Sequence, residues 1–274
     1  MIWRVILPAI AGAALFAASS YPTEIAEWRR NREENLKRDG GWLTVAGLFW
    51  LHEGSNTFGR DAGDDIVLPD GPARAGTFEL KNGKITARMD GSERELWADS
   101  TDAAKVGRLS LFVIKRSDKY AIRLKDPDSE YRRKFHGIEY YPAKEEYRVT
   151  AKWVPAEEKI PILNILGQTE PMVSPGYAVF QLHGKEYRLR PVLETADAKE
   201  LFYIFRDQTA GKETYGAGRF FYSAMPKDGK VELDFNKAYN PPCAFTPFAT
   251  CPLPPAENKL ALRIEAGEKK YGDH

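Results

Sequence analysis

The two cysteines are the residues with the clearest potential for chemistry. Cys243 and Cys251 have seven residues between them, in a segment that also contains five prolines: Pro241, Pro242, Pro247, Pro252 and Pro254. In an exported protein this spacing favours a disulfide, which the loop-entropy model values at about 2–3 kcal/mol. Two free thiols are one alternative. A zinc site completed by a histidine or an acid is another, although structural zinc sites use cysteines that lie closer together. We predict the disulfide and no cofactor.

Polar residues around the cysteines predict a binding site. Asp234 and Asn236 flank Phe235 and share a face if this segment is a strand. Arg219 follows a glycine, where backbone can approach a ligand closely, and Arg219 with Asp234 is either a buried ion pair or a carboxylate-binding site. The predicted ligand-binding residues are Arg219, Tyr215, Asp234, Asn236, Tyr239, Asn240, Glu257 and Asn258. The alternative is a hydrogen-bonded network that orders the proline-rich loop.

No catalytic motif accompanies these residues. The chain has no Gly-x-Ser-x-Gly elbow, no His-Glu-x-x-His and no Gly-x-Gly-x-x-Gly. Asp207-Gln208-Thr209 is not the Asp-Thr-Gly of aspartic proteases. Among the four histidines, His52 beside Glu53 is the best acid–base candidate. We therefore predict ligand binding. A hydrolase of an envelope ester or glycan, and a purely structural envelope module, stay as alternatives.

The first twenty residues have the pattern of a secretory signal peptide. Arg4 is followed by 14 uncharged residues, Val5 to Ala18, and by small residues where a signal peptidase could cut. A membrane-spanning helix needs roughly 20 apolar residues. We expect cleavage, a periplasmic or extracellular location, and no membrane span afterwards. Removing residues 1–20 takes one of the 40 basic residues and none of the 39 acidic ones, so 39 of each remain.

The near-zero net charge limits the kinds of binding partner that we expect. A neutral chain gives no reason to expect nucleic acid, whose binders carry a positive excess. One stretch departs from neutrality: from Lys105 to Lys134 there are ten basic and four acidic residues, a net charge of +6. This stretch is either a solvated face or a site for an anionic ligand, such as a phosphate or an anionic glycan. We therefore expect the partner to be an unidentified ligand, and a ligand with an anionic group is one candidate.

The elements that must position these residues are mainly strands. A helix is expected from about Glu24 to Arg38, and short strands follow at intervals of about ten residues. Asn82-Gly83 and His183-Gly184 mark tight hairpins. Tyr147–Val154 and Ile160–Gly167 read as two separate strands. We predict a mainly β fold: two packed antiparallel β units, each a sandwich or small barrel, with a short N-terminal helix. The predicted parts are a signal peptide (1–20), an N-terminal unit (21–125) and a C-terminal unit with the cysteine loop (126–274).

Two resemblances accompany these patterns. Over the whole mature chain, the sequence resembles the bacterial domain-of-unknown-function family 1684. The segments that carry this resemblance are Trp42–Leu51, Thr214–Phe220, Asp234–Phe245, Thr250–Asn258 and Glu265–Glu268. The resemblance implies no activity. The second is to the opening of a forkhead-associated domain, carried by Leu51–Arg60 and Asp64–Leu68. It implies a β-sandwich. It leaves Arg60 as the single candidate phosphate contact, because the Ser-x-x-His of those domains is missing.

Overall fold

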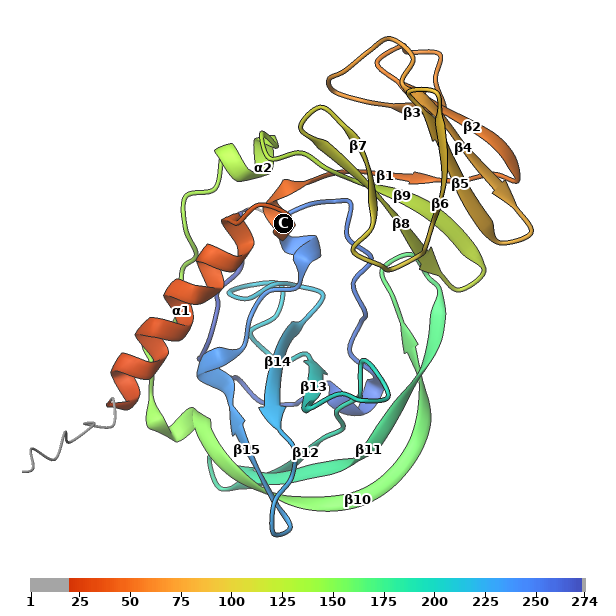
Figure 1. Cartoon of the computed structure of the whole chain (residues 1–274). Helices are drawn as coiled ribbons and strands as arrows, with labels where there is room; N and C mark the ends of the chain where they lie inside the picture. The colour runs from red at the N-terminus through yellow and green to blue at the C-terminus, as the bar shows by residue number, and fades with distance from the viewer. Residues whose placement is uncertain (1–19, 273–274) are drawn as a thin grey trace, which may run out of the picture.

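The computed structural model describes residues 20–272 of the chain, and the fold is mainly β, as predicted (Figure 1). The predicted signal peptide lies outside the described residues apart from Ser20. The strands of the first two sheets end at Lys125, and those of the other two begin at Arg148. None of these sheets closes into a barrel within the described part of the chain. The division into two domains near residue 125 stays a prediction.

The helix α1 (Tyr21–Lys37) begins three residues before the predicted start. Pro22 lies in its first turn, where the missing N–H of proline does no harm and its fixed φ favours a helix. Ile25 and Leu36 are buried, and the other face is charged. Within residues 20–272 the other α-helix is the short α2 (Glu130–Arg133), and the remaining helical turns are 3-10 helices of three residues each. In Figure 1, α1 (red) runs along one side of the sheets of the second half.

The first half of the chain forms two antiparallel sheets with one core between them. Four strands make the first, in the order β1 (Val45–Trp50), β9 (Lys119–Lys125), β8 (Leu109–Arg116) and β7 (Ala103–Val106). Five strands make the other, in the order β3 (Ile66–Val67), β2 (Gly54–Gly59), β4 (Gly76–Lys81), β5 (Lys84–Met89) and β6 (Ser92–Leu96), of which β3 pairs parallel. Asn82 and Gly83 both have positive φ between β4 and β5, so this predicted hairpin is confirmed.

The second half contains the other two sheets. One has the order β12 (Lys185–Leu189), β11 (Thr169–Leu182), β10 (Arg148–Leu163) and β15 (Lys230–Asp234), and the other pairs β13 (Glu200–Phe205) with β14 (Arg219–Ala224). The prediction of two strands where β10 lies is wrong. An irregularity between Pro155 and Glu158 lets one bent strand of 16 residues continue past the proline. In Figure 1, β10 and β11 curve around the β13–β14 pair.

The β13–β14 pair has two different faces because side chains alternate along a strand. Tyr203 and Phe221 lie on one face, with their rings stacked at 4.6 Å, and pack with Phe235 in the main core of this half. Phe202 and Phe220 lie on the other face, in a separate cluster that includes Cys251. The second face looks toward α1.

A buried carboxylate fixes α1 to the second half. Glu268 has no exposed side-chain area, and its two oxygens accept hydrogen bonds from Arg32 Nε of α1 at 2.9 Å and from the backbone N–H of Asn240 at 2.6 Å. Burial raises the pKa of Glu268, and the Arg32 guanidinium opposes that shift. The Tyr21 hydroxyl donates a further hydrogen bond to Asp234 at 2.9 Å.

Replacing Arg32 tests this attachment. Arg32→Met leaves the buried Glu268 carboxylate without its paired cation, and we expect a loss of about 3–5 kcal/mol in the free energy of unfolding at pH 7. Because Arg32 lowers the pKa of Glu268, its removal raises that pKa further. A protonated Glu268 needs no cation, so the loss should shrink as the pH is lowered from 7 to 5. Urea unfolding at both pH values measures this.

Arg30→Met is the matched control, since Arg30 lies on the exposed face of the same helix. We expect it to change the free energy of unfolding by less than about 0.5 kcal/mol at either pH. An equal loss in both variants would mean that the Arg32–Glu268 pair does not hold the helix.

Candidate functional site

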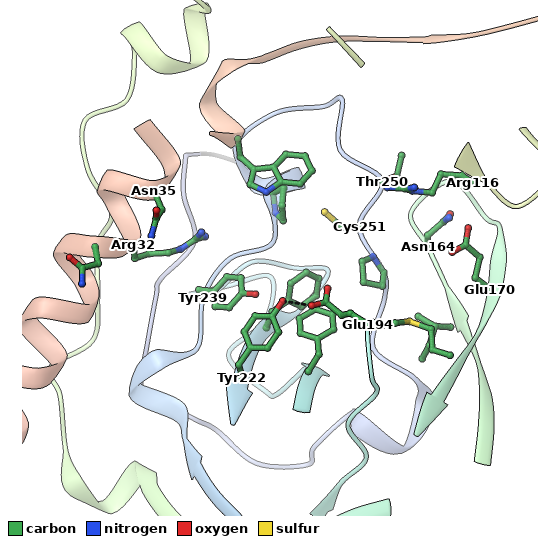
Figure 2. Close-up of a pocket in the computed structure, with 18 of the residues that line it drawn as sticks. Arg32, Asn35, Arg116, Asn164, Glu170, Glu194, Tyr222, Tyr239, Thr250 and Cys251 are labelled. Atoms are coloured by element: carbon green, nitrogen blue, oxygen red, sulfur yellow. Dashed lines mark hydrogen bonds between the residues drawn. The ribbon is translucent and has the colours of Figure 1, made fainter. Parts of the chain in front are cut away.

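A cavity of about 630 Å³ lies between α1, the face of β13–β14 that carries Phe202 and Phe220, and Pro242 and Thr250–Pro252 of the cysteine-containing segment (Figure 2). This volume suits a small organic molecule. Six aromatic side chains line it: Trp28, Trp42, Phe202, Phe220, Tyr222 and Tyr239. We call it the aromatic cavity.

The aromatic wall follows from strand pairing. Phe202 of β13 lies directly opposite Tyr222 of β14, and their rings stack at 4.9 Å. Tyr239 pairs by backbone with Phe220, and its ring lies 6.2 Å from that of Tyr222 at an angle of 17°. Tyr222 keeps 37% of its area exposed. The three rings therefore form a stacked row with Tyr222 in the middle, and Tyr222 is the most exposed of the three. The Arg32 guanidinium lies 4.6 Å from the centre of the Tyr239 ring.

Polar groups stand around this wall. The Tyr222 hydroxyl donates a hydrogen bond to Glu194 at 2.8 Å, the dashed line in Figure 2. Burial raises the pKa of Tyr222, and the neighbouring Tyr239 and Glu194 raise it further, so the phenol keeps its proton and remains a donor. Glu194 has one oxygen bound in this way. It can accept a hydrogen bond from a ligand with the other.

The sides of the cavity come from elements far apart in the sequence. Asn31, Arg32 and Asn35 belong to α1; Figure 2 labels Arg32 and Asn35 at one side. Arg116 and Glu170 lie at the other side. The Arg116 Nε donates to Thr250 Oγ1 at 2.9 Å, and Glu170 accepts the backbone N–H of Ser117 at 3.0 Å. The result is an apolar wall with amide, guanidinium and carboxylate groups on its rim.

The structure places Arg219 inside the core. It is 1% exposed and donates to the carbonyl oxygens of Ala266 and Ile264 and to the carboxylate of Asp207, at 3.3 Å. The predicted pair with Asp234 is therefore wrong, and Asp207 is the partner. The preceding glycine is explained by packing: a Cβ on Gly218 would come within 2.5 Å of the Phe205 carbonyl oxygen.

Four more predicted residues hold neighbouring chain segments together. Asp234 accepts hydrogen bonds from the Tyr21 hydroxyl and from the backbone N–H of Asn236. The side-chain amide of Asn236 accepts the backbone N–H of Lys144 and donates to the Lys144 carbonyl oxygen. Asn240 bonds the Lys269 carbonyl, and Asn258 bonds backbone groups of Arg190 and Ile204. Asp234, Asn236, Asn240 and Asn258 are all buried. They form the kind of network that the sequence left as the alternative.

The other predicted residues lie at different places. Tyr239 lines the aromatic cavity, whereas Glu257 lies 3.5 Å from Arg190 in a neighbouring hollow. Tyr215 packs beside the loop, where burial and the neighbouring Cys243 raise its pKa. His52 is exposed, 3.7 Å from Asp65, and does not line the aromatic cavity. The structure thus brings Tyr239 alone of the predicted ligand-binding set into this cavity.

Both cysteines are free thiols in this structure. The backbone N–H of Cys243 donates to Cys251 Sγ at 3.2 Å, so the two residues are close but not bonded, and the disulfide stays a prediction. Cys251 is buried and lines the aromatic cavity. Within residues 20–272 no group of three or more His, Cys, Asp or Glu side chains could hold a metal ion. The helices of the same range are too short or too polar to cross a membrane.

Most residues of the aromatic cavity were not predicted from the sequence. The alternation of side chains along a strand could have found part of it, because it puts Phe202 on one face of β13 and Phe220 and Tyr222 together on one face of β14. The residues of α1 carried no such signal, because their positions depend on how the helix docks. Arg116 lies in the basic stretch that was noted as a possible anion site.

Comparison with known proteins gives a family for this chain. The model of a family described as proteins of unknown function, DUF1684, matches residues 133–269. Among solved structures, an uncharacterized protein of Haloarcula marismortui, known from a solution NMR structure, is 33% identical. That match covers 50% of this chain and 78% of the other, with a TM-score of 0.43. A search of curated proteins gave no match.

The thiol pair gives a prediction in pH. Hydrogen bonding from the Cys251 thiol lowers the pKa of Cys243, while the same interaction and burial raise that of Cys251. Cys243 should therefore react first with iodoacetamide, at a pH below that of an ordinary thiol, because the thiolate is the nucleophile. Trypsin releases both cysteines in one peptide, Ala238–Lys259, so fragmentation of this peptide by tandem mass spectrometry, after labelling between pH 6 and pH 9, measures each site.

In the variant Cys251→Ala the hydrogen bond is lost, and labelling of Cys243 should shift to higher pH. An unchanged profile would mean that Cys251 does not control Cys243. Labelling of neither cysteine without prior reduction would instead favour the disulfide.

Proposed function

This chain belongs to the DUF1684 family of proteins of unknown function, and we propose from its site that it is an exported protein that binds a saccharide ring in the aromatic cavity. The observation that carries the proposal is the row of Phe202, Tyr222 and Tyr239, with the partly exposed Tyr222 in it and a carboxylate at its edge.

A sugar ring has two chemically different parts. Its C–H faces are apolar and pack on aromatic rings, and the hydroxyls at its edge donate and accept hydrogen bonds. The aromatic cavity offers both partners: the stacked rings for a face, and Glu194 with side-chain amides for the edge. Asn31 and Asn35 are one helical turn apart and line the cavity together, so one helix face presents two amides. A purely apolar ligand would leave these groups without partners, which disfavours it.

A second candidate function is hydrolysis of a glycosidic bond. Glycosidases use two carboxylates that flank the scissile bond, one as the acid and the other as nucleophile or base. Glu170 and Glu194 both line the aromatic cavity. This observation favours hydrolysis over a purely structural role, and product analysis in the binding experiment decides between binding and cleavage.

Binding can be measured with the protein's own fluorescence, because Trp28 and Trp42 line the aromatic cavity. We expect a panel of mono- and disaccharides to contain at least one that changes this fluorescence saturably. Tyr222→Ala removes the exposed ring and should weaken that sugar's binding by about fivefold or more, by analogy with a nucleobase stacked on an aromatic side chain, a contact worth about 1–3 kcal/mol. Glu194→Gln should also weaken it. Chromatography of the sugar after overnight incubation detects cleavage.

Trp97→Ala is the control for Tyr222→Ala, because Trp97 is an aromatic residue 64% exposed that does not line the aromatic cavity. Glu200→Gln, on exposed β13 surface, is the control for Glu194→Gln. Both should bind as the unaltered protein does. If no sugar changes the fluorescence, or if the controls lose binding equally, the proposal fails.

Export is supported by the signal pattern of residues 1–20 and by the position of α1. The helix begins at Tyr21, so cleavage among Ala18, Ser19 and Ser20 leaves it whole. Expressed in a bacterium, the protein should be recovered outside the cytoplasm, with a mature N-terminus between Ser19 and Tyr21 by mass spectrometry. Leu15→Arg interrupts the apolar stretch and should leave an uncleaved precursor in the cytoplasm. Cytoplasmic recovery of the unaltered chain at full length would contradict export.

A further inference from the structure

A second, smaller cavity of about 320 Å³ lies at the C-terminal end of α1, next to the aromatic cavity. The two cavities share three lining residues, Arg32, Asn35 and Trp42. Four basic residues line the smaller one, and no aspartate or glutamate does: Arg32, Arg38, Arg123 and Lys125. We call it the basic cavity.

Arg123 is the unusual member of this set. It is 8% exposed, and its Nε and Nη2 atoms are buried without a hydrogen-bond partner among the described residues. The guanidinium lies 5.0 Å from the ring centre of Trp42. Burial lowers the pKa of Arg123 to about 10, and the nearby Arg116 contributes, so the group still carries its charge at neutral pH. A buried charge without a partner is strongly unfavourable.

The neighbouring basic residues do not relieve this charge. Burial lowers the pKa of Lys125, and repulsion from Arg123 and Arg38 lowers it further. Lys125 donates to the Gly40 carbonyl oxygen at 2.7 Å, just beyond the end of α1, where a helix favours positive charge. Arg32 is paired with Glu268. The C-terminal end of α1 therefore stabilises the charge of Lys125, and the Glu268 carboxylate stabilises the charge of Arg32. Neither group stabilises the charge of Arg123.

We propose that the basic cavity is an oxyanion site, in which a phosphate or sulfate group binds the Arg123 guanidinium with help from Lys125 and Arg38. An oxyanion would supply the acceptors that the buried Nε and Nη2 atoms lack, in the fork geometry that guanidinium groups favour. The inference goes beyond saccharide binding, because it rests on Arg123 whatever occupies the aromatic cavity. The oxyanion is either free or part of a larger ligand that extends past Trp42.

The first test uses inorganic phosphate alone. Isothermal titration calorimetry in chloride buffer should show one phosphate bound per chain, and thermal unfolding should show a melting temperature that rises with phosphate at millimolar concentrations. Arg123→Met should abolish both effects. Because it removes a buried charge that has no partner, Arg123→Met should also be as stable as the unaltered protein, or more stable, without phosphate.

Arg30→Met is the control, since it removes the same charge from the exposed face of α1. It should keep phosphate binding. Equal loss in the two variants would show a general charge effect and overturn the proposal. So would phosphate binding that persists in Arg123→Met, or a marked loss of stability in that variant without phosphate.

The second test separates a free oxyanion from an attached one. Glucose 1-phosphate and glucose are titrated into the same variants. Tighter binding of the sugar phosphate than of inorganic phosphate, lost in Arg123→Met, supports an attached group; equal binding of the two supports a free one. Tyr222→Ala leaves Arg123 intact, so failure of the aromatic cavity would appear as lost sugar binding with phosphate binding retained. If neither phosphate nor glucose 1-phosphate binds, the oxyanion site is refuted.

Discussion

The buried carboxylate of Glu268 is the constraint on which the arrangement of this protein depends. A carboxylate with no exposed area needs a cation and hydrogen-bond donors close by. Arg32 supplies the cation from α1, and Asn240 supplies a backbone donor from the start of the cysteine loop. Three segments that are remote in the sequence therefore meet at one side chain. The meeting point sets where α1 lies, and α1 is one side of both cavities.

Arg219, a second buried charge, supplies hydrogen bonds to backbone that lies outside the sheets. The chain from Lys259 to Glu268 belongs to no strand, so its backbone groups need other partners. Arg219 donates to the carbonyl oxygens of Ile264 and Ala266, and Asp207 accepts the N–H of Ile264. Residue types that suit a ligand site, an arginine next to a carboxylate, are used here to order irregular backbone. This is why the sequence could not distinguish a binding site from a structural network.

What the sequence predicted well is what depends on neighbours along the chain. Alternation along strands and the hairpin at Asn82 and Gly83 are local, and both are found in the structure. The partner of Arg219 is not local. Asp207 lay in a segment noted only for its difference from a protease motif, and the Thr209 hydroxyl bonds its carboxylate. The aromatic cavity depends on where α1 docks on the second half of the chain, which no pattern in the sequence of the helix specifies. Tyr239 was predicted because it lies among the polar residues around the cysteines, and in the structure the neighbouring Asn240 donates its backbone N–H to Glu268.

The two cavities have a common wall, and this bears on how they would act together. Arg32, Asn35 and Trp42 line both, and the ring of Trp42 has the Arg123 guanidinium within 5.0 Å. Arg32 is held by Glu268, so this part of the wall is fixed, whereas Trp42 is only partly buried. An anion that draws Arg123 toward itself changes what Trp42 contacts, and Trp42 is a contact surface for any ring in the aromatic cavity. Coupling of this kind is reciprocal: whatever factor an oxyanion adds to ring affinity, a bound ring adds to oxyanion affinity. A ligand that carries both groups would gain further, because binding one end raises the effective concentration of the other.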